Sequence, residues 1–200
     1  MERNLSERLE IFRSKMVSVH ELTSQGTANE MQFYIFDYDP KEEIRIRKEI
    51  KKAKDNNASV IEFDLYDMML DVINEEGYFD DIKDLEQEHD YDVMLSQVFQ
   101  PLLALEENDS PILRKFRSTV ADDGNHIVLI SGVGKAYPII RSHTILNNLQ
   151  SIFKFNPVVM MYPGRYEVRK KMTLRLFDRL DDDNYYRAFA LVERGNEHAN

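Results

Sequence analysis

The chain has 200 residues, a formal charge of −10 at pH 7 and no cysteine. Its hydrophobic content of 42% can fill one core, so we expect a single domain over residues 1–200. The acidic balance argues against general attraction to DNA, RNA or anionic membranes, and the lack of cysteine excludes disulfides, thiol catalysis and cysteine-based zinc sites. No apolar run approaches the roughly 20 residues of a membrane span, and no apolar signal core follows the N-terminus, so we expect a cytoplasmic protein.

The first 54 residues predict helix, strand and helix. Apolar residues recur every three or four positions between residues 5 and 19, which predicts one N-terminal helix within residues 1–22, with Arg8 on its solvent side. Residues 31–38 predict the first strand, and Asp39 before Pro40 predicts the start of a second helix. Between residues 41 and 54 there are seven basic and three acidic residues. We interpret them as a solvated face, with a phosphate-binding or acidic-partner face as the alternative.

The next part of the chain becomes strongly acidic. Residues 60–64 predict the second strand, and Asp64 caps a helix that follows over residues 65–76. Residues 75–92 contain nine carboxylates and one lysine, interleaved with aromatic residues such as Tyr78 and Tyr91. We interpret residues 75–120 as an acidic helical elaboration of the domain, not as a metal site, and its apolar anchors suit a docking surface for a basic partner.

The last 75 residues complete the predicted sheet. Residues 127–130 and 158–162 are short apolar runs typical of strands buried on both faces, and residues 138–149 predict a helix between them. Such a βαβ unit opens onto a crevice at its carboxyl strand ends. Residues 185–192 predict a fifth strand. We therefore expect an α/β fold with a mainly parallel central sheet of about five strands flanked by helices, similar to P-loop NTPases or Rossmann folds without a nucleotide motif.

The glycine-containing loop after residue 130 does not match the known phosphate-binding spacings. In a phosphate loop a hydroxyl residue follows the lysine, but Ala136 follows Lys135. In the dinucleotide fingerprint a third glycine stands where this chain has Tyr137. We interpret the loop as a turn that needs glycine, with an atypical anion pocket formed by Gly132, Gly134, Lys135 and Arg165 as the alternative.

Several side chains at the predicted strand ends are candidates for an anion-binding or partner-binding rim. They are Gly132, Gly134, Lys135, Arg141, His143, Arg165 and Arg187. His143 shares an apolar helical stripe, which favours a half-buried histidine over a catalytic base. Arg165 and Arg187 could pair with acids such as Asp37 or Asp64, or serve a partner. We predict no catalytic residue, no metal site and no cofactor.

Sequence motifs in a fixed order resemble a known family. They lie at residues 33–40, 129–134 with 138–143, 158–166, and 174–177 with 183–189, and together they span residues 33–191. This ordered set resembles the BrxB family, the B component of bacteriophage-exclusion (BREX) defence systems. Residues 75–120 carry no motif of the family.

The resemblance implies a small cytoplasmic accessory protein of a system that methylates host DNA and blocks phage replication. The family has no assigned catalytic residues. Its expected partners are other BREX components, first the alkaline-phosphatase-like PglZ, with the large ATPase and the methyltransferase in the wider assembly. We therefore expect a non-catalytic adaptor, with self-association left open. The alternatives are a nucleotide- or phosphate-binding protein, and a DNA-binding accessory that uses residues 41–54 and 165–179.

Overall fold

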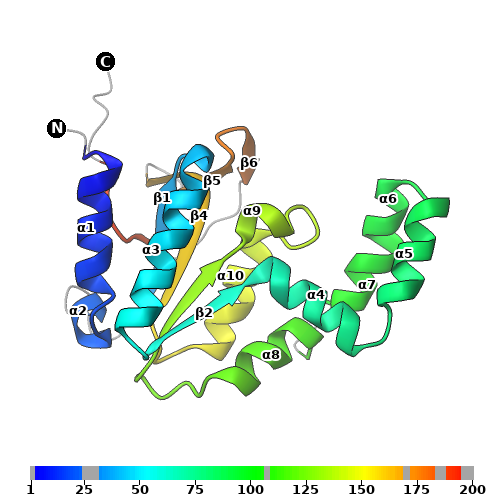
Figure 1. The fold of residues 1–200 in the computed structure, drawn as a ribbon, viewed down its shortest axis with the longest axis horizontal. Coiled ribbons are helices and arrows are strands. Elements are labelled where there is room, and N and C mark those ends of the chain that lie inside the picture. Colours follow the sequence, from blue (N-terminus) through cyan, green and yellow to red (C-terminus); the bar gives the residue numbers. More distant parts are fainter. Residues whose placement is uncertain (1–2, 24–31, 106–108, 169–171, 183–187, 195–200) are drawn as a thin grey trace.

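The fold is built on a central sheet flanked by helices (Figure 1). The computed structural model describes residues 3–23, 32–105, 109–168, 172–182 and 188–194. The strand order is β2-β3-β4-β1-β7, and these neighbours pair in parallel. The strands are β1 (Phe33–Tyr38), β2 (Val60–Asp64), β3 (Ile127–Ser131), β4 (Val158–Val168) and β7 (Phe189–Ala190). The expected α/β architecture is confirmed, with an antiparallel arm that makes the whole sheet mixed.

Helices cover both faces of this sheet and enclose two hydrophobic cores. One face carries α1 (Leu5–Lys15), α2 (Val19–Thr23) and α3 (Glu43–Asn56), the last preceded by the 3-10 helix η1 (Pro40–Glu42). The other face carries α4 (Leu65–Glu75), α8 (Pro111–Thr119), α9 (Val133–Ala136) and α10 (Ser142–Ile152). In the described part of the chain, no helix has the length and apolar character to cross a membrane.

The apolar runs in the sequence follow from these two cores. In β3, Val128 and Ile130 pack on the side of α4 and α10, while Ile127 and Leu129 pack on the side of α1 and α3. Successive side chains of a strand point to opposite faces, so a strand covered on both sides must be apolar at every position. The same alternation holds along the first half of β4.

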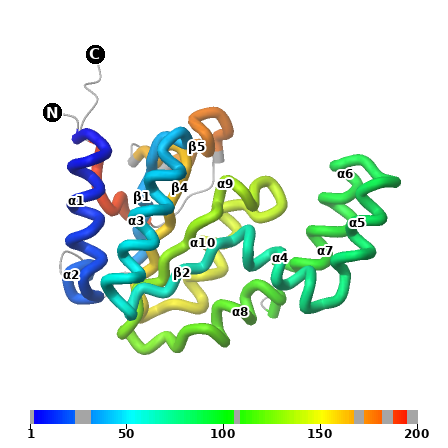
Figure 2. Tube along the Cα trace, in the orientation of Figure 1, coloured from blue at the N-terminus to red at the C-terminus, as the bar shows by residue number. Residues whose placement is uncertain are grey.

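A helical lobe projects from one side of the molecule (Figure 2). We call residues 78–103 the acidic lobe; it contains α5 (Phe79–Glu88), α6 (Tyr91–Val93), the π-helix η2 (Met94–Phe99) and α7 (Gln100–Leu103). Ile82, Met94 and Leu103 are buried and join the core on the α4 side. The lobe is therefore anchored along its apolar face, as its helical pattern predicts.

The predicted fourth strand is too short. β4 continues past Pro163 to Val168 and pairs antiparallel with β5 (Met172–Leu176), which pairs with β6 (Leu180–Asp182). Gly164 permits this arm, because a Cβ there would lie 2.1 Å from the carbonyl oxygen of Arg175. The predicted fifth strand is represented by β7, and residues 183–187 lie outside the described residues.

Two predicted helices differ from those in the structure. The N-terminal helix ends at Lys15, and Asn57 donates side-chain hydrogen bonds to the carbonyls of Met16 (2.9 Å) and Val17 (3.0 Å) in the turn before α2. The crossover helix begins at Ser142, not at residue 138. Tyr137 has an extended backbone, as residues before proline favour, so α9 and α10 form separately.

Candidate functional site

The carboxyl ends of β2 and β3 place Asp64 and Gly132 side by side. Asp64 caps α4, since its Oδ1 accepts hydrogen bonds from the backbone N–H of Tyr66 (3.0 Å) and of Asp67 (3.3 Å). Gly132 has φ of 70°, and a Cβ at this position would lie 2.1 Å from Oδ1 of Asp64. The turn therefore requires glycine for its backbone conformation and for its contact with the cap.

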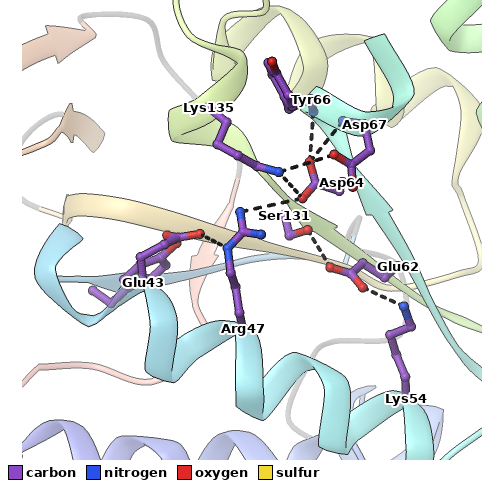
Figure 3. A network of polar contacts seen from close by, with 10 residues as sticks. Glu43, Arg47, Lys54, Glu62, Asp64, Tyr66, Asp67, Ser131 and Lys135 are labelled. Atoms are coloured by element: carbon purple, nitrogen blue, oxygen red, sulfur yellow. Dashed lines mark hydrogen bonds and ion pairs between the residues drawn. The ribbon is translucent and has the colours of Figure 1, made fainter. Parts of the chain in front are cut away.

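Lys135 reaches from α9 to the same cap (Figure 3). Its Nζ lies 2.8 Å from Oδ2 of Asp64 and 3.5 Å from Oδ1 of Asp67. It also lies 5.1 Å from the centroid of the Tyr66 ring, within range of a cation–π contact. An anion that approached Lys135 would have to compete with a carboxylate whose side chain is only 13% exposed.

A second set of contacts joins α3 to the same strand ends. Arg47 Nε lies 2.9 Å from Oε1 of Glu43, and a terminal nitrogen of Arg47 lies 3.9 Å from Oδ2 of Asp64. The hydroxyl of Tyr38 donates to Oε2 of Glu43 at 2.5 Å. Burial raises the pKa of this hydroxyl, and the hydrogen bond to Glu43 raises it further, so Tyr38 stays a neutral donor.

A third set extends the contacts along β2. Ser131 Oγ donates to Oε1 of Glu62 at 2.7 Å, and Lys54 Nζ lies 2.7 Å from Oε2 of Glu62. We call the charged residues and the serine of these neighbouring sets the rim network: Glu43, Arg47, Lys54, Glu62, Asp64, Asp67, Ser131 and Lys135. It contains three cations and four carboxylates, so this edge of the sheet carries no excess of positive charge to attract a phosphate.

The remaining rim candidates lie elsewhere. Gly134 faces the antiparallel arm, since a Cβ there would lie 2.8 Å from Cε1 of Phe177 and 3.1 Å from Cγ of Pro163. Arg141 and the partly buried His143 line a separate cavity of about 80 Å³. This volume is well below the ~300 Å³ at which small-molecule pockets begin.

Of the two arginines in the C-terminal part of the predicted rim, the structure describes Arg165. Arg165 forms an ion pair with Asp178 at 3.5 Å, within the antiparallel arm. Arg187 lies outside the described residues. Of the acids that the sequence suggested as partners, Asp37 contacts Arg8 and Arg194, and Asp64 contacts Lys135 and Arg47, among the described residues. Among the described candidates, the structure brings Gly132 together with Lys135 at Asp64, and Arg141 with His143 at the smaller cavity, but does not join these two pairs in one site.

A buried ion cluster lies behind the strand ends, and the sequence analysis missed it. Arg8 is 3% exposed, and its guanidinium lies 2.6 Å from Oδ1 of Asp37. Oδ2 of Asp37 lies 2.8 Å from Nε of Arg194 and accepts the backbone N–H of Tyr166 at 3.1 Å. Burial lowers the pKa of Arg8, and the charge of Asp37 opposes this shift. The prediction that Arg8 faces solvent was wrong. Arg8 is three residues after Leu5 and four before Phe12, a spacing that places it at the margin of the apolar stripe, and this spacing was the signal of burial in the sequence.

The acidic side chains do not form a metal centre in the part of the chain that the structure describes. No group of three or more His, Cys, Asp or Glu side chains there is arranged to hold a metal ion. The fold and the rim network define an acidic α/β protein. The charged side chains of the rim network, at the carboxyl ends of β2 and β3, form ion pairs with one another.

Comparisons with known proteins identify the family. The family described as "BREX protein BrxB" matches residues 61–191. A protein of that name from Bacillus cereus (strain H3081.97) is 39% identical over 197 residues, which cover 96% of this chain and 100% of the relative. Another from Escherichia coli O9:H4 (strain HS) is 28% identical over 193 residues, 94% of this chain and 92% of the relative. The chain belongs to the BrxB family, as its ordered motifs predict.

No solved structure matches the chain. The expected likeness to phosphate-loop or Rossmann folds therefore stays a prediction.

Proposed function

We propose that this protein is a non-catalytic adaptor of a BREX anti-phage system, which binds other BREX components and supports host DNA methylation and phage restriction. PglZ is the first expected partner, with the large ATPase and the methyltransferase in the wider assembly. Membership of the BrxB family supports the BREX context. The observation that carries the non-catalytic part is the ion pair of 2.8 Å between Lys135 and Asp64.

This ion pair occupies the group that a nucleotide site would need. Lys135 is the only lysine in the glycine loop, and to bind a phosphate it would have to leave the carboxylate that caps α4. Ala136, the next residue, offers no hydroxyl for a magnesium ion. The rim network, with four carboxylates against three cations, also offers the phosphate chain of a nucleotide no excess of positive charge.

The acidic lobe supplies a surface suited to a partner. Between residues 80 and 92 it contains seven carboxylates and one lysine. Tyr78, Phe79 and Tyr91 are 47%, 50% and 52% exposed, so large aromatic surfaces lie beside these charges. Aromatic residues are enriched in protein interfaces, and a negative surface attracts a complementary positive one. We therefore assign the acidic lobe to docking of a basic partner surface.

Affinity capture from cells that express the complete defence operon tests the adaptor function. We expect the tagged chain to recover PglZ, and we expect the variant Asp84→Lys with Glu88→Lys, at two exposed positions of the acidic lobe, to recover less. The matched control is Glu10→Lys with Asp55→Lys, which makes the same charge change at exposed positions on the opposite face of the sheet. Recovery of no BREX component by the wild-type chain would contradict the adaptor proposal.

Thermal unfolding with ATP and magnesium tests the competing nucleotide-binding function. A ligand that binds only the folded state stabilises it by RT ln(1 + [L]/Kd), so a true site gives a Tm that rises with the logarithm of ligand concentration once this exceeds Kd. We expect no such rise. A concentration-dependent rise in Tm that Lys135→Ala abolishes, and that the exposed control Lys154→Ala retains, would show that the site binds nucleotide.

A further inference from the structure

β2 is an open edge of the central sheet. In the described part of the chain it pairs with β3 and with no strand on its other side. The carbonyl of Ser59 accepts the N–H of Ile127 at 2.9 Å. Because alternate residues of a strand bond to the same neighbour, the backbone groups of Ile61 and Phe63 face β3, and those of Glu62 face away. Such an edge is a template for an added strand.

A groove of about 490 Å³ runs across this open edge. Glu62, which contacts Lys54 of α3, lines it from one face of the sheet. Phe63, which packs against Phe116 of α8, and Thr119 at the end of α8 line it from the other face. Side chains from both faces of β2 can border one groove only where the groove crosses the edge of the strand. Figure 1 shows β2 between α3 and α8.

The groove is acidic and includes two apolar side chains. Asp67, Asp71 and Glu75 recur at four-residue spacing along α4, and their side chains are 69%, 66% and 62% exposed. The groove also contains Phe63 and Met68. Its full set of charged side chains is Glu62, Asp64, Asp67, Asp71 and Glu75, with Lys54 and Lys115. Five carboxylates against two lysines leave an excess of three negative charges.

Within the residues that the structure describes, two of these carboxylates have only long contacts to cations. Asp67 lies 3.5 Å from Lys135, and Asp71 lies 3.9 Å from Lys115, which makes its shorter contact of 2.7 Å with Glu75. An exposed carboxylate with such a loose contact can accept a new cationic partner with little loss. The pair is therefore placed to bind lysine or arginine side chains of an incoming segment.

We propose that this groove binds an extended segment of a partner protein that carries alternating basic and apolar residues, added as a strand to the open edge of β2. The outward backbone groups around Glu62 hold the main chain of the segment, and Asp67 and Asp71 hold its basic side chains. Charge complementarity selects such an occupant. The inference relies on the adaptor function for its partner, and assigns that partner a surface distinct from the acidic lobe.

Fluorescence anisotropy with the purified full chain and a labelled, end-blocked peptide of alternating lysine and valine, three of each, tests the proposal. We expect saturable binding at low salt that weakens at 0.5 M salt, and none for the peptide with glutamate in place of lysine. Two further peptides carry N-methyl groups on all valines or on all lysines. Hydrogen-bonding positions alternate along a strand, so one of these two must lose binding. If both N-methylated peptides bind as well as the parent peptide, the segment is not added as a strand. If the parent peptide does not bind, the groove is not a binding site for such a segment.

Matched variants separate the groove from general acidity. Asp67→Asn with Asp71→Asn is expected to weaken peptide binding about five-fold, from two exposed ion pairs. Glu10→Gln with Asp55→Asn removes the same charge from exposed positions on the opposite face of the sheet and is expected to leave binding unchanged. Equal weakening by both variants would contradict a specific groove.

The same assays distinguish this inference from the adaptor proposal. If the peptide does not bind but operon capture still recovers PglZ, the groove fails and the adaptor function stands. If the peptide binds but capture recovers no BREX component, the adaptor proposal fails alone. A second copy of this chain is the other possible occupant of the groove, and sedimentation of the free chain tests it. If the chain self-associates and Asp67→Asn with Asp71→Asn abolishes this self-association, the groove binds a second copy and the proposal is overturned.

Discussion

The substitution Asp37→Asn tests whether the buried ion cluster holds the N-terminal helix and the C-terminal segment on the sheet. It removes the negative charge that faces both Arg8 and Arg194 and leaves Arg8, only 3% exposed, beside a like charge. Removing one partner of a buried pair costs about 3–5 kcal/mol. Because asparagine keeps an oxygen that can accept the N–H of Tyr166, we expect the lower end, a loss of about 3 kcal/mol.

Urea unfolding followed by circular dichroism measures this loss as a lower midpoint at unchanged m value. In a chain of this size, about 3 kcal/mol corresponds to a Tm lower by roughly 6–12 °C. Asp181→Asn is the matched control, because the pair of Asp181 with Arg175 is 59% and 49% exposed and contributes less than about 1 kcal/mol. If Asp37→Asn and Asp181→Asn have equal effects, the buried cluster does not contribute as its geometry implies.

Two further expectations concern local contacts. Gly132→Ala should destabilise the fold by about 2–3 kcal/mol in chemical unfolding, because its φ of 70° and its closeness to Asp64 both oppose a side chain. The control Gly77→Ala, at a residue with φ of 80° and nothing within 4 Å of a Cβ, should reduce the free energy of unfolding by only about 1–2 kcal/mol. Equal losses would mean that the closeness of residue 132 to Asp64 does not affect stability. The hydrogen bond from Arg13 is the largest cause that lowers the pKa of Glu49 from 4.5 to about 2. Because the pKa of Glu49 is lower in the folded state than in the unfolded state, its ionised side chain stabilises the fold above about pH 4.5, and this contribution is lost as pH falls towards 2. Glu49→Gln should therefore flatten the pH dependence of the free energy of unfolding between these two pH values.

Much of the secondary structure could be read from local patterns. The run at residues 127–130 indicated a strand because it is apolar at every position, and the cap at Asp64 indicated a helix start. The boundaries that were wrong depend on contacts from far along the chain. β4 extends past Pro163 because β5 folds back on it, and the N-terminal helix ends at Lys15 in a turn that Asn57 holds.

The candidate site was less predictable than the fold. The glycine requirement at residue 132 was visible in the sequence, whereas the neutralisation of Lys135 by Asp64, 71 residues earlier in the chain, was not. Periodicity predicted that Arg8 faces solvent, because a helix pattern shows which face of the helix is apolar. It does not show whether a carboxylate such as Asp37 lies close to the margin of that face in the folded chain.

The sequence by itself determined the α/β class, the acidic character of residues 75–92, the absence of known nucleotide motifs and the ordered motifs of the BrxB family. These are properties of local composition and spacing. The tertiary structure decided which strand forms an open edge, which charges neutralise one another and where the groove beside β2 lies. Strand order and long-range pairing arise only when the chain is folded, because they join residues that no sequence period connects.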